Sequence, residues 1–131
     1  MIGLDTNVLI RYLVQDDPVQ SPAASEVIER LTELDRGFVS IVALVEMSWV
    51  LTRAYQVDDP TLVAIITNLL GADEITVERP EAVRAAVAKL ESGARFADAV
   101  IAELGREAAC ETTLTFDRTA SERAGMRLIA S

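Results

Sequence analysis

Four acidic residues stand at positions where a purely structural role does not call for a charge. Two of them follow short apolar runs typical of buried strands, and two lie in helical segments with apolar neighbours. In chain order they are Asp5, Glu46, Asp98 and Asp117. Four like charges that converge on one pocket need cations, and an all-oxygen ligand set favours Mg²⁺ or Mn²⁺. Such ions activate water and polarise phosphoryl oxygens, so this set predicts metal-assisted hydrolysis of phosphodiesters.

Glu46 is the most informative of the four. Its neighbours three and four positions away along a helix are all apolar, namely Val42, Ala43, Trp49 and Val50. An unpaired carboxylate buried on such a face carries a large desolvation cost. We therefore expect Glu46 to face inward and to be neutral, paired with an arginine, or neutralised by a metal ion.

Each of the other three carboxylates also has a structural interpretation that stays open. Asp98 has Arg95 as the only charge within a helical turn, so it can form a surface pair or interact favourably with the N-terminus of its helix. Asp5 can serve as a turn or helix-cap residue, and Asp117 can cap the last helix. The metal-site hypothesis depends on the four residues taken together.

Short apolar runs alternate along the chain with segments of helical periodicity, and this pattern must position the four acids. It predicts strands over 2–4, 38–39, 74–77 and 113–116, and helices over 8–13, 21–34, 41–55, 59–70, 80–93, 96–109 and 117–124. Such alternation is typical of an α/β fold in which a parallel sheet carries helices on both faces and ligands bind beyond the carboxyl ends of the strands. Asp5 and Asp117 fall at such ends, and 131 residues suit a single domain.

Composition excludes several other classes of chemistry. The chain has no His, which removes Ser-His-Asp and Cys-His catalysis and most zinc sites. One cysteine, Cys110, permits no internal disulfide, and we expect it to pack on a late helix. The one lysine, Lys89, is expected at the surface. No glycine-rich phosphate loop is present.

Location and charge also constrain function. The longest run without a charge, Pro60–Ala72, is shorter than the roughly 18 residues of a membrane-spanning helix, and no signal peptide is recognisable, so we expect a cytoplasmic protein. The net charge of -9 argues against broad, tight binding to nucleic acids. Three arginines near the acidic residues are candidates for phosphate contacts: Arg11, Arg95 and Arg118.

Four segments of the chain resemble, in order, the motifs of the PIN-domain ribonucleases, and within them the VapC toxins of toxin-antitoxin pairs. These segments are Ile2–Arg11, Ser40–Glu46, Phe96–Ala102 and Leu114–Asp117. The resemblance implies one PIN domain over residues 1–131, a three-layer sandwich with a central parallel sheet of four or five strands and helices on both faces. It also implies a Mg²⁺- or Mn²⁺-dependent endoribonuclease that is held inactive by a cognate antitoxin and forms a homodimer.

The same resemblance assigns roles to particular residues. It implies that Asp5, Glu46, Asp98 and Asp117 are the catalytic, metal-holding acids, with polar support from Thr115, Thr6, Asn7 and Ser40. The chain departs from the family at one position, because many relatives carry an Asp where this sequence has Arg95. Arg95 and the acidic surface motivate an alternative, a catalytically inactive PIN-fold module that binds protein or RNA. A phospho-accepting receiver domain fits less well, because the late strands lack a lysine.

Overall fold

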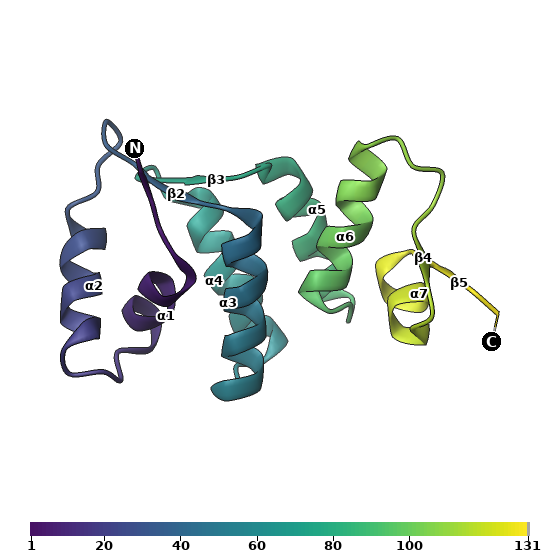
Figure 1. Cartoon of the computed structure of the whole chain (residues 1–131), viewed down its shortest axis with the longest axis horizontal. Helices are drawn as coiled ribbons and strands as arrows, with labels where there is room; N and C mark the ends of the chain where they lie inside the picture. The colour runs from purple at the N-terminus through teal and green to yellow at the C-terminus, as the bar shows by residue number, and fades with distance from the viewer. Residues whose placement is uncertain (131) are drawn as a thin grey trace. The chain divides into compact units, whose positions relative to one another are not determined.

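The computed structural model describes residues 1–130 (Figure 1). The chain divides into two compact units. Unit 1 comprises Met1–Val57 and Asn68–Glu78. Unit 2 comprises Asp58–Thr67 and the chain from Arg79 onward. Each unit has helices and parallel strands of its own, so the chain is of the α/β class, as the alternating pattern predicts.

Three parallel strands form the sheet of unit 1, in the order β1-β2-β3. They are β1 (Ile2–Gly3), β2 (Gly37–Val39) and β3 (Ile75–Val77). Pairing continues one residue beyond each outer strand, because the Leu4 amide donates to the Phe38 carbonyl and the Glu78 amide to the Val39 carbonyl, both at 2.9 Å. The residues that follow the three strands therefore meet at one edge of the sheet.

Helices α1 (Thr6–Val14), α2 (Gln20–Glu29) and α3 (Ile41–Ala54) complete most of unit 1, and α1 packs against both of the others (Figure 1). One face of α3 is buried through Leu44, Met47 and Leu51, which follow the spacing of an inward helical stripe. These side chains are almost fully removed from solvent, so α3 is anchored firmly in the core.

Unit 2 is built around two neighbouring helices, α5 (Pro80–Glu91) and α6 (Phe96–Glu107) (Figure 1). Beyond them, β4 (Leu114–Thr115) and β5 (Arg127–Leu128) form a parallel pair joined by α7 (Arg118–Ala124). Helix α4 (Asp59–Gly71) contributes its first part to unit 2 and its last residues to unit 1.

Lys89 and Cys110 both lie in surroundings that differ from the prediction. Lys89 is not a free surface residue, because its Nζ lies 3.0 Å from Oε1 of buried Glu103 and donates to the Ala124 carbonyl at 2.8 Å. It thereby satisfies a carboxylate inside unit 2. Cys110 does not pack on a helix, because α6 ends three residues earlier and the thiol is exposed.

One helix is shorter than the apolar periodicity predicts. The expected helix over 21–34 ends at Glu29, and Thr32 and Asp35 instead exchange backbone hydrogen bonds at 3.2 Å. The Asp35 amide also donates to the Thr32 hydroxyl at 3.1 Å, and such local side-chain bonds compete with helix formation. Leu34, predicted to lie on the inward stripe, is almost fully exposed as a result.

The five strands pair as one sheet of three and one of two, so a single sheet of four or five strands is not confirmed. Within residues 1–130, no helix has the length and apolar character needed to cross a membrane.

Candidate functional site

Asp5 follows β1 and caps α1. Its Oδ1 accepts a hydrogen bond from the Thr6 amide at 2.9 Å, which fixes the carboxylate at the start of the helix. The cap interpretation therefore holds, yet it engages only one carboxylate oxygen. The second oxygen, Oδ2, accepts no hydrogen bond from any residue in the range 1–130, and the side chain is exposed. A helix cap thus orients Asp5 without consuming its capacity to bind a cation.

Thr6, the next residue, carries an unsatisfied hydroxyl. The residue is buried, and its Oγ1 is the one buried side-chain polar atom without a hydrogen-bond partner in the part of the chain that the structure describes. Buried hydroxyls normally form a hydrogen bond, so we expect Thr6 Oγ1 to bond to a group other than the side chains of unit 1, such as water. Asn7 follows as an exposed residue on the first turn of α1.

Ser40 and Glu78 together fix the start of α3. Ser40 Oγ accepts from the Ala43 amide at 3.1 Å, as its predicted cap role requires. Glu78 Oε1 accepts from the Ile41 amide at 2.9 Å, across 37 positions of sequence. The sequence patterns did not identify Glu78 as a residue that positions α3, although it follows a predicted strand as Asp5 and Asp117 do.

Glu46 lies on the exposed face of α3, and the expectation that it faces inward was wrong. The apolar residues one turn before and after it, Val42 and Trp49, are themselves 66% and 61% exposed. Helix α3 carries apolar residues on two faces. The face with Leu44, Met47 and Leu51 packs in the core, and the face with Glu46 is exposed. The Glu46 carboxylate is therefore accessible to a cation.

Asp117 in unit 2 is held much as Asp5 is held in unit 1. It caps α7, with Oδ1 accepting from the Ala120 amide at 3.0 Å. Its own amide donates to Thr115 Oγ1 at 3.0 Å, so Thr115 positions the residue as a polar support. The other oxygen, Oδ2, lies 4.0 Å from an Arg95 guanidinium nitrogen. This contact is long and exposed, which leaves Oδ2 open to a stronger cation.

Asp98 lies in the first turn of α6 and is partly buried. Burial raises the pKa of its carboxyl, the nearby Asp117 carboxylate raises this pKa further, and the charge of Arg95 opposes both effects. Asp98 and Asp117 are therefore electrostatic neighbours within one unit. The expected surface pair between Asp98 and Arg95 is not formed, because Arg95 reaches toward Asp117 instead.

The three candidate phosphate contacts differ in availability. Arg11 is engaged within unit 1, where its Nε donates to Gln20 Oε1 at 2.8 Å and a guanidinium nitrogen lies 3.5 Å from Asp16. Arg95 and Arg118 flank Asp117 on exposed positions. Unit 2 therefore offers the more accessible cations.

The predicted acids thus fall into two pairs, with Asp5 and Glu46 in unit 1 and Asp98 and Asp117 in unit 2. Among residues 1–130, no three acidic or thiol side chains form a group that could hold a metal ion. The chemistry of the donors nevertheless suits Mg²⁺ or Mn²⁺, because they are hard carboxylate oxygens, and a bound cation would relieve the repulsion between Asp98 and Asp117.

Comparison with protein families identifies the chain's family. The PIN domain family matches residues 2–126, a range that spans both units and contains all four predicted acids. No curated protein matches the chain.

Proposed function

The chain belongs to the PIN domain family, and from this premise we propose that it is a metal-dependent endoribonuclease of the VapC type, the toxin of a toxin-antitoxin pair. PIN domains are generally metal-dependent nucleases. The narrower role rests on the order and spacing of the four acidic motifs along the chain.

The observation that carries the proposal is the pair formed by Asp98 and Asp117. Burial raises the pKa of Asp98 and the Asp117 carboxylate raises it further, so a bound cation would favour the charged form of both groups. Asp117 caps α7 with one oxygen, which leaves its second oxygen for a cation shared with Asp98. Arg95 offsets the repulsion only partly, since it stands 4.0 Å from Asp117 and is largely exposed.

We propose that residues 1–131 form one PIN domain with a central parallel sheet of four or five strands and helices on both faces. Asp5, Glu46, Asp98 and Asp117 would then hold Mg²⁺ or Mn²⁺. The ion would supply Lewis-acid polarisation of the scissile phosphate and lower the pKa of an attacking water.

The chain's own side chains would hold the acids and the substrate. The helix caps of Asp5 and Asp117 fix one oxygen of each carboxylate and leave the other without a hydrogen bond among residues 1–130. Thr115 supports Asp117 through its amide, and Ser40 supports Glu46 indirectly by fixing the start of α3. Thr6 and Asn7, which follow Asp5, would serve as polar supports for ordered water.

Arginines would contact the substrate. Arg95 and Arg118, which flank Asp117, would contact phosphates of RNA through charge-assisted hydrogen bonds, and Arg11 would do so after releasing Asp16.

The proposed partners follow from the same assignment. A cognate antitoxin would cover the acidic site, two copies of the chain would form a homodimer, and the RNA target would lie in the cytoplasm. A basic antitoxin segment would complement the net charge of -9.

The test is incubation of the purified protein with total cellular RNA, with and without EDTA, followed by sequencing of new 5′ ends. We expect discrete ends that require metal and that disappear in Asp98→Asn. Asp73→Asn is the matched control, because Asp73 is an exposed acid outside the proposed site. Wild-type cleavage by Asp98→Asn would contradict the proposal, and folded protein that binds RNA without cutting it would favour the inactive binding module.

A further inference from the structure

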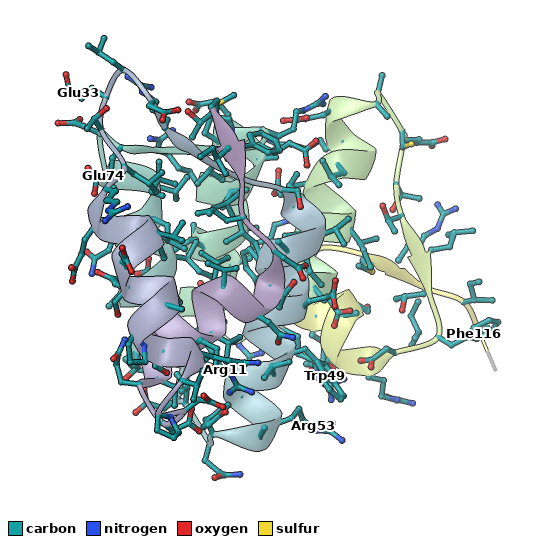
Figure 2. The ribbon with its side chains drawn as sticks, turned by 60° about the vertical axis from the view of Figure 1, so that its left-hand side comes forward. Arg11, Glu33, Trp49, Arg53, Glu74 and Phe116 are labelled. Carbon is teal, nitrogen blue, oxygen red and sulfur yellow. The ribbon has the colours of Figure 1, made fainter. Side chains whose placement is uncertain are left out.

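Helix α3 presents an exposed row of four residues beside the core face. Val42, Glu46, Trp49 and Arg53 recur at helical spacing, so they share one side of the helix; we call them the α3 row. Figure 2 shows Trp49 and Arg53 near the end of α3 with their side chains directed away from the ribbon. Trp49 is 61% exposed, although tryptophan is usually among the more buried residues.

Arg53 and Trp49 form a cation–π pair. The guanidinium carbon lies 5.3 Å from the centroid of the indole, inside the range in which the ring attracts a cation. Arg53 makes no ion pair with a carboxylate anywhere in the range 1–130, so its charge is available. The guanidinium occupies one face of the indole at most, which leaves aromatic surface for a second planar group.

A second arginine lies at the same end of α3. Asp16 accepts a hydrogen bond from Tyr55 Oη at 3.1 Å, and Tyr55 directly follows α3. The same carboxyl group lies 3.5 Å from a guanidinium nitrogen of Arg11. Arg11 is engaged by Asp16 and Gln20, so Arg53 supplies the available positive charge beside the aromatic surface.

This combination matches the chemistry of single-stranded nucleic acid. Unpaired bases stack on aromatic side chains, and arginines beside them neutralise the phosphates. Glu46 lies in the same row and is one of the acids proposed to hold the metal, so the proposed function brings RNA to this face of α3.

We propose that Trp49 and Arg53 form a stacking platform for an unpaired base of the RNA substrate, an inference that rests on the proposed nuclease function. Trp49 follows Glu46 by three residues, a rise of about 4.5 Å along the helix. A base stacked on Trp49 would therefore belong to a nucleotide within about one step of the phosphate near Glu46. Trp49 is a positioning residue that selects unpaired RNA and takes no part in the chemical step.

The test uses the fact that Trp49 is the only tryptophan in the chain, so its fluorescence reports on this site alone. The full chain is titrated in EDTA, which prevents cleavage, with a single-stranded 12-residue oligouridylate and oligoadenylate and with an RNA duplex of the same length. We expect quenching by the single strands and none by the duplex.

Variants then separate stacking from folding, with binding of fluorescently labelled RNA followed by anisotropy. Trp49→Ala should weaken binding by about 10-fold, as expected for loss of one stacked base, and Trp49→Phe should restore most of it. Arg53→Gln should weaken binding by about 5-fold. Arg30→Gln is the matched control. Arg30 is an exposed arginine far from α3 in sequence, at the end of α2, where it pairs with Glu26.

The outcomes distinguish this inference from the proposed function. Metal-dependent cleavage without quenching, and with unchanged binding by Trp49→Ala, would overturn the platform and leave the nuclease intact. Quenching by single strands in a protein that never cleaves RNA would support the platform and remove the nuclease. A shift of tryptophan emission that depends on protein concentration, with no response to RNA, would overturn the platform and assign the α3 row to contact between copies.

Discussion

The Asp98 carboxyl has a raised pKa because it is partly buried and, second, because the Asp117 carboxylate lies near it. The two residues are 19 positions apart in sequence and come from α6 and the start of α7. Each acid lies at the start of a helix, Asp98 in the first turn of α6 and Asp117 as the cap of α7, so the starts of two helices bring the like charges close enough to interact.

Substitution of Asp117 should lower the pKa of Asp98. Asp117→Asn removes one of the two causes of the shift while Asn preserves the cap of α7, so the Asp98 pKa should move toward the ordinary aspartate value of 3.8. Arg95→Gln should move it the other way, since Arg95 lowers this pKa. Carbon-detected NMR titration of the Asp98 carboxyl measures both. Equal pKa values in wild type, Asp117→Asn and Arg95→Gln would contradict the electrostatic coupling.

Asp98 should cost the protein stability at neutral pH. An acid with a raised pKa binds more protons folded than unfolded, so stability falls as pH rises from 3.8 through the folded-state pKa and the full penalty remains above it. Asp98→Asn should therefore raise the free energy of unfolding at pH 7, by up to about 1 kcal/mol. The gain should vanish below pH 3.8. Urea denaturation at several pH values measures the difference.

Asp58 offers a control of opposite sign for that experiment. Hydrogen bonds from the Thr61 side chain and then the Thr61 amide lower the Asp58 pKa, so this carboxylate stabilises the fold above pH 3.8 and loses that contribution in acid. Asp58→Asn should not raise stability at pH 7. A rise in both variants would point to a general effect of reducing negative charge.

Ser40 and Glu78 should both contribute to the placement of α3. Ser40→Ala removes the side-chain cap and should cost about 1 kcal/mol, whereas Ser40→Asn should cost little. Glu78→Gln should cost less than Ser40→Ala, because the amide oxygen of Gln can still accept from the Ile41 amide. Chemical denaturation measures each change. A neutral Ser40→Ala variant would show that α3 is fixed by its core face alone.

Some of this arrangement could be predicted from the sequence, since it depends on local signals. Asp5 and Asp117 were correctly placed after strands, because a short apolar run that ends in an acid is readable in a few residues. The Ser40 cap was predicted for the same reason.

Glu46 shows where local signals fail. Apolar residues surround it on α3, but the pattern does not say which apolar face meets the core. Leu44 and Met47 are buried while Val42 and Trp49 are exposed, and nothing in their residue types distinguishes the two sets.

Contacts between residues far apart in the sequence could not be predicted from the local apolar pattern. Glu78 reaches Ile41 because β2 and β3 are neighbours, and the order of strands in a sheet is a property of the whole chain. The pairing of Lys89 with Glu103 likewise depends on how α5 packs on α6. A lysine with no nearby acid along its helix face therefore looked like a solvated residue.

Lys89 should be important for the stability of unit 2. Glu103 is 5% exposed, so removing its partner leaves a buried carboxylate with only the longer contact to Arg106 at 3.6 Å. Lys89→Met should lower the free energy of unfolding by about 3 kcal/mol. The double variant Lys89→Met, Glu103→Leu should recover much of the loss, because it leaves no unpaired charge. Thermal denaturation compares the two, and equal losses in both would contradict this account.

Metal binding should reveal which acids act together. An ion that binds only the folded protein stabilises it by about 2.7 kcal/mol at 100 times its dissociation constant, a rise of roughly 10 °C in melting temperature for a domain of this size. If all four acids hold the same ion, Asp5→Asn in unit 1 should reduce the effect of Mn²⁺ as strongly as Asp98→Asn in unit 2. If only the pair in unit 2 binds, Asp5→Asn and Glu46→Gln should keep the full rise. Asp73→Asn should behave as wild type, and a rise of equal size in all variants would mean that Mn²⁺ binds elsewhere.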